Sequence, residues 1–116
     1  MSRITATELE LLTFFEVQPV LLDPAHPWPY NDAEYRVSRD DETLLFRLSP
    51  AYRDTHIVLQ RAGQTVYELE AEGLHDVRYH VDGERESLEL VIAGESRLFL
   101  TLKPQVSIRQ STKRPT

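Results

Sequence analysis

Apolar and polar residues alternate with a period of two along most of the chain after Tyr35. This period is typical of β-strands with one buried face, because successive side chains point to opposite sides of a sheet. About seven such segments fit before Ile108. Antiparallel pairing in sequence order then gives one continuous apolar face. That face holds Tyr35, Val37, Leu44, Phe46, Leu48, Ile57, Leu59, Tyr67, Leu69, Ala71, Val77, Tyr79, Val81, Leu88, Leu90, Ile92, Leu98, Leu100 and Leu102.

The connections between these segments are short and contain turn-forming residues. Ala62-Gly63-Gln64 and Gly73-Leu74-His75 read as tight hairpin loops, Asp82-Gly83 opens a longer loop, and residues 93–96 form the last. No connection is long enough for the crossover that parallel strands require. The pattern therefore predicts an antiparallel meander and excludes a doubly wound α/β fold.

A helix is predicted near the N-terminus, ending by about Val17 because Pro19 follows. Thr5 and Glu8 have the spacing of a capping box. A strand over residues 11–17 is the alternative. Leu9, Leu12 and Phe15 share one helix face, whereas Leu11 and Phe14 lie on another side. A helix with so broad an apolar surface should contact more than one layer.

One short helix cannot cover the apolar face of a seven-stranded sheet, so we expect the sheet to curve around the helix, as in a half-barrel. The predicted fold class is α+β, mostly β. Residues 1–108 should form a single globular domain. Residues 109–116 lack apolar periodicity and should form a flexible polar tail.

Composition narrows the classes of function. The 116 residues include no cysteine, which excludes disulfide scaffolds and thiolate chemistry, and the net charge of −6 disfavours a phosphate-binding surface. Glu8 and Glu10 interrupt what would be the apolar core of a secretory signal, and no apolar run reaches membrane-spanning length. We therefore expect a cytoplasmic protein with no cofactor, no nucleic-acid partner and no membrane partner.

The polar face of the predicted sheet gathers titratable side chains. Pairing Leu59 with Tyr67, Leu69 with Tyr79, and Tyr79 with Leu90 places His56, Glu70 and Arg78 in one row and Glu68, His80 and Glu89 in the next. Histidine beside carboxylates can act as a general base or bind a divalent metal, with Asp54 as a further ligand. The plainer interpretation is a solvated face with ion pairs, and we assign no catalytic or metal-binding residue.

Two further groups of residues are candidates for contact with a partner. Trp28 and Tyr30 lie in a proline-rich loop, where Trp28 either contacts a partner or, as we favour, plugs an open end of the sheet. The predicted register also puts Val91 opposite Phe99 on the polar face. Exposed apolar pairs at a sheet edge need cover, from the helix, the C-terminal segment or a second subunit in a homodimer.

No motif in the chain resembles that of a known family, so three hypotheses rest on its chemistry. The first is a noncatalytic protein-interaction module, such as an inhibitor or immunity-type protein whose acidic surface engages a basic protein partner. The second is a small-ligand binder that uses Tyr35, Tyr67 and Tyr79 inside a curled sheet. The third is an enzyme that uses His56, His80 and the glutamates.

Overall fold

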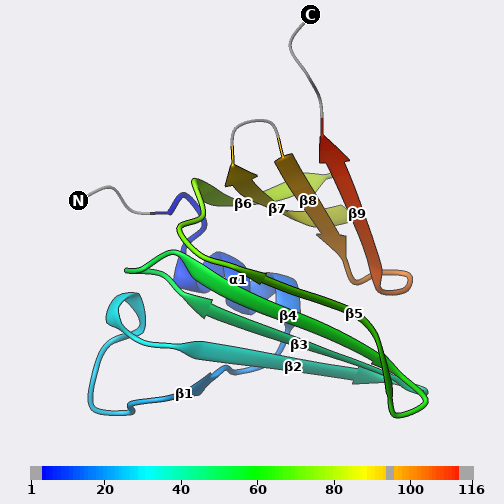
Figure 1. The fold of residues 1–116 in the computed structure, drawn as a ribbon, viewed down its shortest axis with the longest axis horizontal. Helices are drawn as coiled ribbons and strands as arrows, with labels where there is room; N and C mark the ends of the chain where they lie inside the picture. The colour runs from blue at the N-terminus through cyan, green and yellow to red at the C-terminus, as the bar shows by residue number, and fades with distance from the viewer. Residues whose placement is uncertain (1–3, 94–95, 113–116) are drawn as a thin grey trace, which may run out of the picture.

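The computed structural model describes residues 4–93 and 96–112 and contains one α-helix, one 3-10 turn and nine strands (Figure 1). In chain order these are α1 (Glu8–Phe15), β1 (Val20–Leu21), η1 (Trp28–Tyr30), β2 (Ala33–Arg39), β3 (Glu42–Ser49), β4 (Asp54–Arg61), β5 (Gln64–Ala71), β6 (Asp76–Asp82), β7 (Arg85–Ala93), β8 (Ser96–Thr101) and β9 (Ser107–Thr112). The predicted α+β class, mostly β, is confirmed.

The described strands form two antiparallel sheets, each with its strands in sequence order. One sheet is β1-β2-β3-β4-β5 and the other is β6-β7-β8-β9. The meander connectivity is therefore confirmed within each sheet. The prediction of one continuous sheet is wrong, because β5 and β6 belong to different sheets and the expected pair Leu69–Tyr79 does not form.

The segment between β5 and β6 shows why the sheet is interrupted. Leu74, expected in a tight hairpin loop, is only 1% exposed. Its backbone N–H donates to the carbonyl of Arg53 at 2.7 Å, and the N–H of His75 donates to the carbonyl of Val91 at 2.8 Å. Because Arg53 precedes β4 and Val91 lies in β7, these bonds fasten the segment to both sheets. It is a crossing between sheets instead of a hairpin.

Helix α1 lies between the two sheets (Figure 1) and packs against both. The ring of Phe15 stacks on Tyr35 of β2, with centroids 4.7 Å apart. The ring of Phe14 meets Tyr79 of β6 edge to face at 6.2 Å. The prediction that the helix contacts more than one layer is thus confirmed, although Leu9, expected on a buried face, is 70% exposed.

The helix begins two residues later than the sequence suggested. Thr7 is the N-cap and forms a reciprocal capping box with Glu10. Thr5, the expected cap, instead donates its backbone N–H and hydroxyl to the Asp76 carboxylate at 2.7 and 2.6 Å. Thr5, which the capping-box spacing assigned to the start of the helix, therefore forms hydrogen bonds to β6 instead.

The predicted alternation of apolar residues matches burial closely in β2, β3 and β4 and less well in the second sheet. Tyr79 pairs with Leu88, two residues from the expected partner, and Val81 is 58% exposed. Strand β9 continues to Thr112, so the expected tail is wrong for residues 109–112. Residues 113–116 lie outside the described part of the chain.

Candidate functional site

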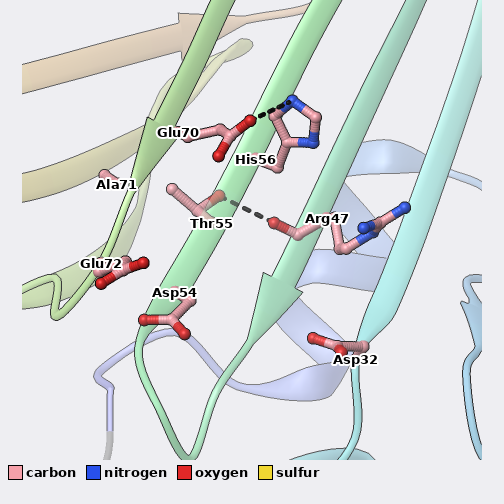
Figure 2. A pocket seen from close by; sticks show the side chains of 8 residues that line it. All are labelled: Asp32, Arg47, Asp54, Thr55, His56, Glu70, Ala71 and Glu72. Atoms are coloured by element: carbon pink, nitrogen blue, oxygen red, sulfur yellow. Dashed lines mark hydrogen bonds and ion pairs between the residues drawn. The ribbon is translucent and has the colours of Figure 1, made fainter.

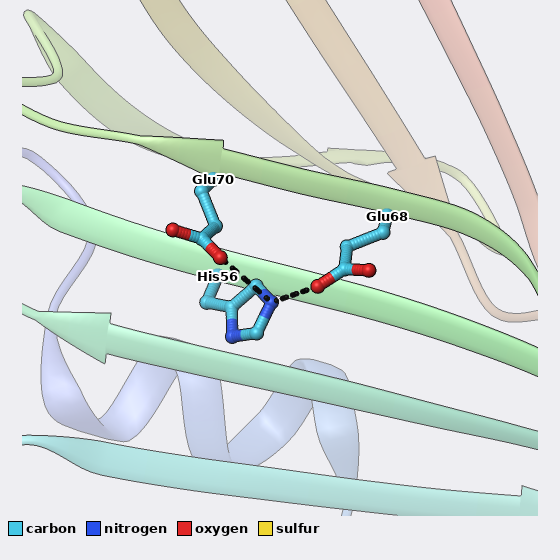
Figure 3. Close-up of side chains that lie close together, drawn as sticks. All are labelled: His56, Glu68 and Glu70. Carbon is cyan, nitrogen blue, oxygen red and sulfur yellow. Dashed lines mark hydrogen bonds and ion pairs between the residues drawn. The ribbon is translucent and has the colours of Figure 1, made fainter.

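His56, Glu68 and Glu70 form a cluster on the outer face of β4 and β5 (Figure 3). Strand alternation puts them there, since the neighbouring Ile57 is fully buried on the inner face. His56 pairs with Glu70 in the ladder. The His56 Nε2 lies 2.8 Å from the Glu68 Oε2 and 3.7 Å from the Glu70 Oε1. The ladder thus places His56 beside Glu70, as the predicted register did, with Glu68 in the neighbouring row.

A hollow of about 390 Å³ opens beside this cluster on the same face (Figure 2). The described residues that line it are Asp32, Arg47, Asp54, Thr55, His56, Glu70, Ala71 and Glu72. They include four carboxylates and one guanidinium. The Arg47 side chain points toward β2, where its Nη2 lies 3.4 Å from the Glu34 Oε1. The hollow is therefore lined mainly by negative charge.

The side chains of the cluster remain open to solvent. The exposed fractions are 31% for His56, 51% for Glu68 and 75% for Glu70. Ion pairs with this exposure contribute about 0–1 kcal/mol each to folding. The three ligand atoms lie within 4.8 Å of one another, so an imidazole nitrogen and two carboxylates are the donors that could hold a divalent cation. The fold itself gains little from the arrangement.

Arg78, His80 and Glu89, expected in the same patch, lie on the other sheet. Glu89 is 8% exposed, and its Oε1 is 2.8 Å from the His80 Nε2 and 3.9 Å from the Arg78 Nη1. The Arg97 Nε is 3.3 Å from the Glu89 Oε2. The single predicted patch is therefore two separate clusters. Because a buried carboxylate needs opposite charge nearby, the second cluster serves to compensate Glu89.

Trp28 is only 7% exposed, and its indole Nε1 donates to the Tyr35 hydroxyl at 3.0 Å. Burial raises the pKa of Tyr35 to about 12, against a smaller lowering by the Trp28 hydrogen bond. This burial agrees with the plug interpretation for Trp28, whereas Tyr30 is 64% exposed. The Tyr35 hydroxyl, which the small-ligand hypothesis assigned to ligand binding, accepts this hydrogen bond instead.

The expected apolar pair Val91–Phe99 does not form. Val91 pairs with Arg97 and is 4% exposed, and Phe99 pairs with Glu89. The guanidinium carbon of Arg109 lies 4.6 Å from the centroid of the half-buried Phe99 ring. Val91 is therefore not exposed for a subunit contact. The pairing of β7 with β8 is shifted by two residues from the predicted register.

Sequence reasoning missed two acidic residues of the hollow, Asp32 and Glu72. Glu72 continues the two-residue spacing of Glu68 and Glu70, and that spacing was a usable signal. Asp32 immediately precedes β2 and reaches the hollow only through the order of the strands. No local pattern pointed to it.

No family model matches the chain, and no curated protein matches its sequence. A chain of a solved structure, described as a contact-dependent growth inhibition toxin–immunity protein complex from Klebsiella pneumoniae 342, is similar in fold. The TM-score is 0.77 at 16% sequence identity, covering 91% of this chain and 93% of that one. The two chains share a fold. Among the described residues, no helix is long and apolar enough to cross a membrane.

Proposed function

We propose that this chain is a noncatalytic protein-interaction module of the immunity type, which binds a basic partner protein through the outer face of β4 and β5. The observation that carries the proposal is the open hollow with four carboxylates and one guanidinium. Two of these carboxylates, Asp54 and Glu70, lie on strands of the sheet. Side chains held in this way need little reorganisation to receive lysine or arginine side chains of a partner. The net charge of −6 also attracts a basic partner, and this attraction acts over longer distances.

The structural likeness supports a protein partner, because the similar chain belongs to a complex of a toxin with its immunity protein. The site supports the inhibitory side of such a pair. Active sites favour mostly apolar pockets with a few polar groups. The His56 cluster instead lies on an open strand face, where water reaches all of its side chains. A toxin-like partner with a basic surface fits this face best.

Affinity capture from the native host tests the proposal. The tagged chain should recover a basic protein in stoichiometric amount, and Glu68→Lys/Glu70→Lys should recover much less of it. The matched control is Asp82→Lys/Glu84→Lys, which makes the same change in net charge at the exposed end of β6 and in the turn that follows it. This control should capture as well as the unmodified chain. No stoichiometric protein, or equal loss with both variants, would contradict the proposal.

A further inference from the structure

Strand β5 is an edge of its sheet. In the described part of the chain its only ladder neighbour is β4. It is eight residues long, whereas β1, at the opposite edge, has two. An edge strand of this length offers a row of backbone N–H and C=O groups to another extended segment. The sheet therefore has one side on which a further strand could be added.

The side chains of β5 differ between its two faces. Glu68 and Glu70 point outward and are 51% and 75% exposed. Tyr67 and Leu69 point inward and are half-buried, whereas Ile57, the ladder partner of Leu69, is fully buried. Cover over the core thus thins at this edge. An added strand would find carboxylates on one face and apolar side chains on the other, each at two-residue spacing.

We propose that β5 receives an extended basic segment of the partner protein as a sixth strand. The lysine or arginine side chains of this segment lie beside Glu68 and Glu70, and the apolar side chains of the segment lie beside Tyr67 and Leu69. Backbone hydrogen bonds supply affinity in this mode of recognition, and the alternating side chains supply specificity. The inference rests on the proposed function and names the part of the acidic face that the partner occupies.

Charge determines which segment fits. A second copy of β5 would bring Glu68 and Glu70 of one chain beside the same residues of the other. Like charges directly opposite each other in a sheet are destabilising. The edge is thus protected against pairing with itself and remains complementary to a basic strand.

The test uses the full chain, labelled with ¹⁵N, and a six-residue peptide of alternating lysine and valine. The peptide should shift the amide signals of β5 and slow hydrogen exchange at every second β5 amide, because alternate N–H groups face the free edge. Glu68→Lys/Glu70→Lys should weaken binding at least about tenfold. Asp82→Lys/Glu84→Lys should bind like the unmodified chain.

A second peptide, of alternating lysine and proline, carries the same charge but cannot donate backbone hydrogen bonds at its proline positions. It should bind much more weakly. Equal binding of both peptides, or protection of β5 amides without alternation, would overturn strand addition. A lysine–valine peptide that leaves β5 unaffected would do the same. These results leave capture of the partner protein intact, so they are distinct from failure of the proposed function.

Discussion

Two tyrosine hydroxyls in the interior have opposite surroundings. The Tyr35 hydroxyl accepts the indole N–H of Trp28, whereas the Tyr67 hydroxyl is buried without a hydrogen-bond partner among the described residues. Removing one partner of a buried hydrogen bond costs about 1–3 kcal/mol, because the other partner is left unsatisfied. Tyr35→Phe should therefore lower the free energy of unfolding by about that amount.

Tyr67→Phe is the matched control, since it removes a hydroxyl with no bond to lose. Its free energy of unfolding should equal or exceed that of the unmodified chain. Urea denaturation followed by fluorescence of Trp28 measures both variants on one scale. Equal losses in the two variants would show that the Trp28–Tyr35 hydrogen bond does not matter for stability.

The protonation of Asp76 should make the stability of the fold depend on pH. Burial acts to raise the pKa of its carboxyl, but hydrogen bonds from Thr5, Arg78 and the Val77 N–H outweigh it, so the pKa lies below the usual 3.8. A lowered pKa stabilises the folded state above the unfolded value, and this contribution is lost as pH falls through the folded pKa. The window for the loss is therefore below pH 3.8.

Asp76→Asn should be less stable than the unmodified chain at neutral pH and should lose less stability on acidification. Thermal unfolding at a series of pH values from about 2.5 to 7 measures this difference. Two stability curves that stay parallel through the acid range would contradict the role assigned to the carboxylate.

At the scale of elements, Leu90 and Val81 were both predicted on the apolar face of the sheet, but they differ in burial. Leu90 in β7 is fully buried, whereas Val81 near the end of β6 is 58% exposed. Leu90→Ala should lower the free energy of unfolding by about 2–5 kcal/mol, because it leaves a cavity in a packed core. Val81→Ala should change it by less than about 0.5 kcal/mol. Chemical denaturation gives both values, and the reverse ranking would contradict the burial of Leu90 and the exposure of Val81.

The elements themselves were largely predictable because their signals are local. Alternation specifies β2, β3 and β4, and the turn Ala62-Gly63 specifies the hairpin that brings His56 to Glu70. The break after β5 was not predictable in this way. Alternation resumes in the same phase beyond Leu74, and the bonds that fasten that segment come from Arg53 and Val91, far away in sequence. The clear local sign was an apolar residue in an expected turn.

At the scale of the whole molecule, the same break decides which parts of the site could be predicted. The cluster of His56, Glu68 and Glu70 lies within one hairpin, so local register was sufficient to find it. Arg78, His80 and Glu89 depended on pairing across the break and lie on the second sheet. The hollow depends on the order of the strands within the sheet, which brings Asp32 close to the acidic side chains of β4 and β5.

If the outer face of β4 and β5 binds a basic partner, as we propose, its negative charge should accelerate their encounter. The most direct test measures the association rate of this chain with the captured partner by stopped-flow fluorescence at increasing salt concentrations. The unmodified chain should bind quickly at low salt and lose about 10-fold or more of its rate as salt screens the field. Glu68→Lys/Glu70→Lys should associate more slowly at low salt, and its rate should depend less on salt. Asp82→Lys/Glu84→Lys should keep most of the association rate and most of its salt dependence. A double variant in Glu68 and Glu70 that associates with the rate and salt dependence of the unmodified chain would contradict this role of the acidic face.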